Sequence, residues 1–140
     1  MPTVTRCACV AFVLSLAAAS SASQHTVDEL RGTWRGTSTC TDRVAAPACQ
    51  DETVVYEFRD GDKAGTIILA ADKIVNGARV PMGEMTFTYD PPLACWRSEF
   101  ESPRLKWRWC FSVEGKTLKG TATQLPGKQV VRRISVRRVS

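Results

Sequence analysis

After residue 32, apolar and polar positions alternate through most of the chain, and short turns rich in Gly, Pro and Asp separate the alternating stretches. A period of two is typical of strands with one buried face. The pattern predicts eight strands, over residues 33–40, 53–59, 66–75, 84–90, 95–100, 105–110, 117–124 and 129–139. Such a series, with no helix between strands, closes most economically into an antiparallel up-and-down barrel; an open sandwich is the alternative.

A short helical turn precedes the strands. Thr26 and Glu29 have the Thr-x-x-Glu spacing of a capping box, which predicts one turn over residues 27–31. Gly32 then ends the turn, and the remainder of the chain is expected to be all β.

The fifth and sixth strands form a hairpin around Ser102 and Pro103. Antiparallel pairing around this turn places Trp96 opposite Trp109 on one face and Cys95 opposite Cys110 on the other. Directly opposed cysteines lie close enough to form a disulfide. The hairpin therefore predicts a Cys95–Cys110 bond.

Residues 1–23 have the features of an export signal. Arg6 is followed by an apolar run over residues 8–17 and by small residues over 18–23, with a cleavage site near residue 22 or 23. The apolar run is too short to span a bilayer, so we expect no transmembrane segment. Residues 24–140 are then one periplasmic or secreted domain with a single core.

The cysteine content agrees with export. Residues 24–140 hold four cysteines, Cys40, Cys49, Cys95 and Cys110. An even number in a small exported domain indicates two disulfides, and the hairpin leaves Cys40 to bond Cys49. Zinc is disfavoured because there is no CxxC pair and the only histidine, His25, is expected in a flexible tail. We therefore expect no metal and no cofactor.

Charge is distributed unevenly along the chain. Without residues 1–23, which contain one base and no acid, the net charge is +4 instead of +5, and seven bases but no acid follow Glu114. This basic end could bind an anionic surface such as lipid or polysaccharide. An ordinary solvated last strand explains the same pattern, since the bases alternate with Val and Ile. Nucleic acid is not expected as a partner, because no platform of aromatic and basic residues stands out.

Three residues after the helical turn carry a resemblance to a known family. Gly32-Thr33-Trp34 begins the first strand, and the meander ends in a strand that carries Arg138. This combination resembles the lipocalin-like (calycin) barrels, in particular small exported bacterial ones. In that superfamily a Gly-x-Trp packs at the closed end, under an Arg from the last strand. The resemblance implies structural roles for Gly32, Trp34 and Arg138.

The long connections over residues 41–52 and 76–83 lie at one end of the predicted barrel, so a cavity should open beneath them. We expect inward residues near this mouth to bind a ligand: Ser38, Tyr56, Met85, Phe87, Phe100, Trp107, Gln124 and Arg132. A buried guanidinium needs a carboxylate, an aromatic face or an anionic ligand. One hypothesis is that Arg132 and Tyr56 hold the acidic head of a fatty-acid-like molecule. Its tail would pack on Trp107 and Phe87. The alternative is a plugged barrel, because eight strands enclose little more than their own side chains.

Catalysis is not expected. The Ser- and Thr-rich stretch 36–40 has no histidine partner in the body of the domain, and the acidic pairs fall in loops. We predict a monomeric, non-enzymatic protein that holds a small apolar or amphipathic ligand, anionic if its head is acidic. The alternative is an interaction module, such as a secreted protease inhibitor or an envelope-associated protein. Such a module would act through surface loops, above all 41–52, or through the basic last strand.

Overall fold

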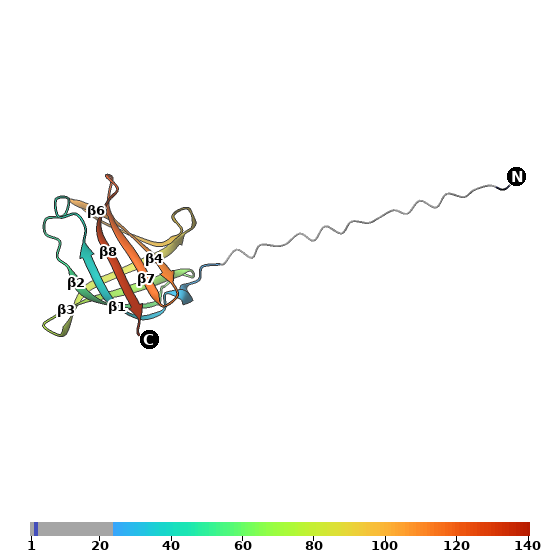
Figure 1. Ribbon diagram of the computed structural model, residues 1–140, viewed down its shortest axis with the longest axis horizontal. Coiled ribbons are helices and arrows are strands. Elements are labelled where there is room, and N and C mark those ends of the chain that lie inside the picture. The colour runs from blue at the N-terminus through green and yellow to red at the C-terminus, as the bar shows by residue number, and fades with distance from the viewer. Residues whose placement is uncertain (1, 3–23) are drawn as a thin grey trace.

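The structure is a computed structural model that describes residue 2 and residues 24–140. The predicted export signal falls, apart from residue 2, outside the described residues. Eight antiparallel strands form a closed barrel in which each strand pairs with its neighbours in the chain and β8 returns to β1 (Figure 1). The up-and-down barrel is therefore confirmed, and the open sandwich is excluded.

Every connection in the barrel is short enough to keep consecutive strands adjacent. The strands are β1 (Gly32–Cys40), β2 (Glu52–Asp60), β3 (Thr66–Val75), β4 (Ala78–Asp90), β5 (Cys95–Ser102), β6 (Leu105–Glu114), β7 (Thr117–Gln124) and β8 (Gln129–Arg138). Two 3-10 turns, η1 (Val27–Glu29) and η2 (Pro91–Leu93), precede β1 and β5.

The β3–β4 connection is much tighter than the long loop expected over residues 76–83. Asn76 and Gly77 have φ values of 51° and 80°, so they form a two-residue hairpin turn. β4 begins directly after it, at Ala78. Only the β1–β2 loop is therefore a long connection at this end.

The β5–β6 hairpin differs from the predicted register by two residues. Trp96 pairs with Phe111 and Phe100 with Trp107, because Ser102 already pairs with Leu105 and leaves a two-residue turn. A shift of two keeps every side chain on its predicted face. Cys95 and Cys110 consequently bond as diagonal neighbours, with Cα atoms 5.6 Å apart. Both predicted disulfides, this one and Cys40–Cys49, are confirmed.

The closed end of the barrel is sealed by the segment around η1. Trp34 is fully buried, its Nε1 donates to the Leu30 carbonyl at 2.8 Å, and the Arg138 guanidinium lies 4.3 Å from the ring centroid. Arg138 also donates to the carbonyl oxygens of Glu29, at 2.6 Å, and of Arg31. A Cβ on Gly32, whose φ is +118°, would meet the Ser140 carbonyl oxygen. Gly32, Trp34 and Arg138 thus lie together at this end.

The turn is not held by the predicted capping box. Thr26 makes no side-chain cap, and the Glu29 carboxylate instead contacts Trp96 Nε1 and, at 3.0 Å, His25 Nδ1. His25 also stacks on Tyr89, with ring centroids 4.2 Å apart. The expectation that His25 is a flexible tail residue is wrong, because this ring packs against the closed end.

Aromatic side chains fill the interior above this seal. Phe111 packs against Phe58 and Phe87, with ring centroids 6.2 and 5.1 Å apart. Its ring also covers Gly120, where an added Cβ would lie 2.2 Å from the ring carbons. The closed half of the barrel is therefore a dense core.

Candidate functional site

The open half of the barrel contains a cavity of about 750 Å³. Six of the eight residues predicted to contact a ligand line it: Ser38, Tyr56, Met85, Phe100, Trp107 and Arg132. The interior is therefore not plugged along its whole length. A volume of this size accommodates a small organic molecule or a short lipid.

The other two predicted residues lie elsewhere. Phe87 is fully buried among Phe58 and Phe111, because the β3–β4 register places it opposite Ile67 toward the closed end. It does not line the cavity, so the structure gives no support to the predicted contact between the ligand tail and Phe87. Gln124 pairs with Trp107 across β6 and β7 but is likewise not among the lining residues.

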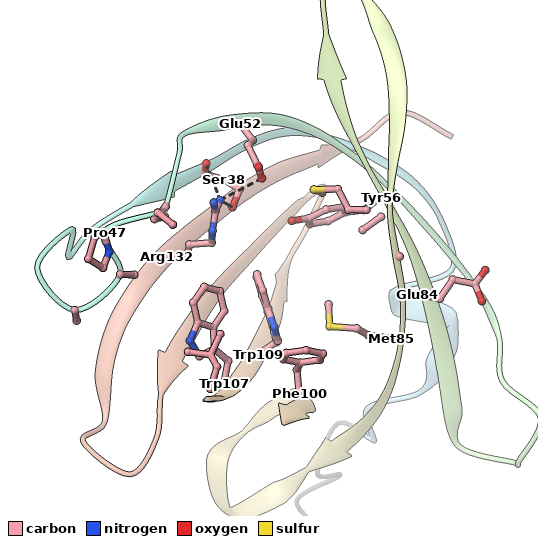
Figure 2. A pocket seen from close by; sticks show the side chains of 18 residues that line it. Ser38, Pro47, Glu52, Tyr56, Glu84, Met85, Phe100, Trp107, Trp109 and Arg132 are labelled. Carbon is pink, nitrogen blue, oxygen red and sulfur yellow. Dashed lines mark hydrogen bonds and ion pairs between the residues drawn. The ribbon is translucent and has the colours of Figure 1, made fainter. Parts of the chain in front are cut away.

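One wall of the cavity is polar and centres on Arg132 (Figure 2). Its Nη1 donates to Ser38 Oγ at 2.7 Å and approaches a Glu52 carboxylate oxygen at 3.3 Å, and its Nη2 donates to the Gln50 carbonyl at 2.7 Å. Only 8% of Arg132 is exposed. A buried guanidinium was expected to need a carboxylate, an aromatic face or an anionic ligand, and in the structure its partner is the Glu52 carboxylate. Glu52 also lines the cavity, which the sequence reasoning missed.

Tyr56 borders this polar group, with its hydroxyl directed toward Arg132 in Figure 2. Burial raises the pKa of Tyr56 well above its ordinary value, while the charge of Arg132 and the hydroxyl of Ser38 act in the opposite direction. The phenol therefore stays protonated at neutral pH, and it can both donate and accept a hydrogen bond.

The facing wall is aromatic and apolar. Trp107, Trp109, Phe100 and Met85 lie across the cavity from Arg132 (Figure 2). Trp109 pairs with Ser98 instead of the predicted Trp96, and it lines the cavity. Trp107 Nε1 and Gln124 Oε1 are buried and have no hydrogen-bond partner within residues 24–140. Of these two residues only Trp107 lines the cavity, so this wall is mainly an apolar, aromatic surface.

The β1–β2 loop forms part of the cavity wall. Ala45, Ala46, Pro47 and Ala48 line the cavity from this loop, which the Cys40–Cys49 bond closes. Hydrogen bonds fix the loop internally: Asp42 Oδ1 accepts from the backbone of Ala45 at 2.9 Å, and Arg43 donates to the Cys49 carbonyl at 2.9 Å. The clipped loop predicted from the sequence thus presents a small, apolar surface to the cavity.

A second opening lies between β4 and β5. These strands pair only where Thr88–Asp90 meets Cys95–Arg97, whereas the other neighbouring strands pair over most of their length. Beyond this short ladder, Met82 and Phe100 line the cavity from opposite edges and are 42% and 49% exposed. The cavity is therefore accessible from the side of the barrel.

Comparison of the chain with protein-family models, with curated proteins and with solved structures gave no match. The closed eight-strand antiparallel barrel is compatible with a lipocalin-like fold. Over residue 2 and residues 24–140, no helix has the length and apolar character needed to cross a membrane. Within the same residues, no three His, Cys, Asp or Glu side chains gather in a way that could hold a metal ion.

Proposed function

We propose that this chain is a lipocalin-like, extracytoplasmic binding protein without enzymatic activity, which carries a small apolar or amphipathic molecule in its barrel as a monomer. The observation that carries the proposal is the cavity of about 750 Å³, with one polar and one aromatic wall. Ligand sites commonly have a mostly apolar lining and a few convergent polar groups. Two disulfides suggest an oxidising compartment, and they support export.

The polar wall limits the charge of the ligand. Because Glu52 already lies beside Arg132, a carboxylate head would have to compete with Glu52 for the same guanidinium. An uncharged polar head meets no such competition and can bond to the hydroxyls of Ser38 and Tyr56. We therefore favour a ligand whose head is uncharged.

The aromatic wall determines which kind of apolar part the ligand can have. Trp107 and Trp109 have ring centroids 6.1 Å apart and face the polar group across the cavity. Indole rings offer a large apolar surface. A flat or aliphatic body matches this wall.

Support for a non-enzymatic role comes from the position of the only histidine. His25 lies with Glu29 and Tyr89 at the closed end, away from the cavity lining. Tyr56, the titratable hydroxyl that does line the cavity, is held in its protonated form by burial.

Native mass spectrometry of the oxidised protein, purified without detergent, tests the proposal first. We expect one small molecule to be retained and released on denaturation. If no small molecule is retained, the protein is titrated with a long-chain fatty acid and with its methyl ester, while tryptophan fluorescence is followed. Saturable binding of either lipid by one site supports the proposal, and failure to bind both contradicts it.

Arg132→Met, with its outward neighbour Arg133→Met as the matched control, separates the two kinds of head group. If the ligand head is uncharged, Arg132→Met leaves the preference for the ester over the acid unchanged. If the wild type prefers the acid and only Arg132→Met removes that preference, Arg132 binds an acidic head, as the original hypothesis states.

A further inference from the structure

On one side of the barrel the outward arginines form ion pairs with carboxylates, and on the other side they form none within residues 24–140. Every arginine of β2 to β6 has a carboxylate partner, in the pairs Arg59–Glu84, Arg79–Glu57, Arg97–Asp90 and Arg108–Glu99, at 2.8 to 3.1 Å. The outward arginines of β1 and β8 are Arg35, Arg133 and Arg137. None of these three has an ion pair within residues 24–140, and residues 1–23 contain no acid.

The barrel register brings these three cations together on one outer surface. Arg35 lies directly opposite Arg137 across β1 and β8, and Arg133 lies farther along the same strand between Thr39 and Thr121. Four residues of a strand span about 13 Å, so Arg133 lies about that far along β8 from Arg137, with Ser135 between them. Directly opposed like charges destabilise a sheet, so the Arg35–Arg137 pair makes the barrel less stable. Figure 1 shows β1, β8 and β7 side by side.

A groove of about 410 Å³ lies on the same surface. Its lining combines hydroxyl groups and two cations, from Thr37, Thr39, Ser112, Thr121, Ser135, Lys119 and Arg133, with apolar surface from Leu93, Ile134 and the Cys95–Cys110 disulfide. Glu114 also lines the groove and pairs with Lys119 at 2.9 Å, so Arg133 is the cation of the groove that has no ion pair within residues 24–140. Among residues 24–140, no aromatic side chain lines the groove, which argues against stacked bases as the ligand.

We propose that this basic face, defined as Arg35, Arg133, Arg137 and the hydroxyl-lined groove beside them, binds an acidic polysaccharide. Arginine pairs with carboxylate and sulfate groups through paired N–H donors, and the Thr and Ser side chains exchange hydrogen bonds with sugar hydroxyls. The site lies outside the barrel and does not depend on the cavity or on its ligand. It would hold the protein on an anionic glycan while the cavity stays accessible.

Binding of heparin and alginate to the full oxidised protein, at several salt concentrations, tests this proposal, with neutral dextran as the uncharged glycan. The test variant is Arg35→Gln/Arg133→Gln/Arg137→Gln. The matched control, Arg59→Gln/Arg97→Gln/Arg108→Gln, removes the same charge from the paired side. We expect the test variant to lose about tenfold in affinity and to show a weaker salt dependence, while the control changes by less than about twofold.

Equal losses in the two variants would show that net charge alone attracts the glycan, and would overturn the proposal. Absence of glycan binding by the wild type overturns it too. Tighter binding to phosphatidylglycerol vesicles or to single-stranded DNA than to both glycans assigns the face to another partner. The test variant should fold, since it relieves the Arg35–Arg137 repulsion; its thermal midpoint, at or above that of the wild type, checks this.

Discussion

Two arginines on the inner face of β8, Arg138 and Arg132, meet different surroundings at the two ends of the barrel. Arg138 lies over the Trp34 ring and donates to the Glu29 carbonyl, with no acid involved. Arg132 donates to Ser38 and to the Gln50 carbonyl and pairs with the Glu52 carboxylate. The residue type and the strand face are the same, so the difference comes from what the opposite strands and loops present.

The contrast separates a structural arginine from one that a ligand can use. The partners of Arg138 are an aromatic ring and backbone carbonyls, which the fold holds in place. Those of Arg132 include two side chains and a loop carbonyl beside a cavity that a ligand can enter. An arginine is therefore best judged by whether its partners leave room for another molecule.

The largest expected effect is the loss of the seal at the closed end. Arg138→Ala removes the cation–π contact and leaves two carbonyls without a donor, so we expect the free energy of unfolding to fall by about 3 kcal/mol. Urea denaturation measures it. The control Arg137→Ala, one residue away and outward, should change stability by less than about 0.5 kcal/mol. Similar losses in the two variants would contradict a specific role for Arg138.

The second effect tests whether the two ends differ in packing. Gly120→Ala places a methyl group against the Phe111 ring, which is fully buried and packed against Phe58 and Phe87, and should cost about 2 kcal/mol of unfolding free energy. Gly127→Ala is the control, since a Cβ there meets no atom within 4 Å.

Ala71→Leu provides the counterpart at the open end. Ala71 lines the cavity, so the larger side chain should change stability by less than about 0.5 kcal/mol while weakening the binding of a lipid probe. The same urea titrations compare the variants. A loss for Ala71→Leu as large as that for Gly120→Ala would mean that the open end is as tightly packed as the closed end.

Much of the fold could be predicted because local chemistry decides it. Alternation located the strands, the hairpin of β5 and β6 gave the Cys95–Cys110 disulfide, and Cys40 and Cys49 remained as the second pair. The register of β5 and β6 could not be obtained in this way, since a shift of two residues buries the same faces. What decides it is the pairing of Ser102 with Leu105, which closes a tighter turn than expected.

The site was predictable only in part, because its polar group forms when distant strands meet. Arg132 faces inward by alternation alone, but its partner Glu52 is 80 residues away in the sequence. Their contact depends on the closure of β8 against β1, which places Ser38 opposite Ile134 on one side and opposite Glu52 on the other. Neither pairing is visible in the local pattern around Arg132.

The third prediction concerns the pair at the open end. Arg132→Met leaves the Glu52 carboxylate without its cation and should lower the unfolding free energy by about 1 kcal/mol, less than at Arg138 because the Glu52 side chain, which is 20% exposed, can be reached by water. Adding Glu52→Gln to Arg132→Met should restore part of the loss. A double-mutant cycle by urea denaturation measures the coupling. Additive single effects would mean that the two side chains do not interact.

The smallest expected effect is a change in the pKa of Tyr56, which depends on the charges around the cavity. The chain has two tyrosines, so Tyr89→Phe leaves Tyr56 as the only phenol whose tyrosinate absorbance can be followed. Burial raises the pKa of Tyr56 above the usual value of about 10, so ionisation should begin only at higher pH. Since the folded state then holds this proton more tightly than the unfolded state, stability is unaffected below the usual tyrosine pKa and falls as pH rises above it.

The same titration links Tyr56 to Arg132. Because the positive charge of Arg132 lowers the pKa of Tyr56, Arg132→Met in the Tyr89→Phe background should move the tyrosinate transition to still higher pH. Glu52→Gln should move it down, since the carboxylate acts in the opposite direction. Arg138→Lys, at the far end of the same strand face, serves as the control and should leave the transition in place. A transition near the usual tyrosine pKa that is the same in all three variants would mean that Tyr56 faces water. The polar wall inferred for the ligand head would then not exist.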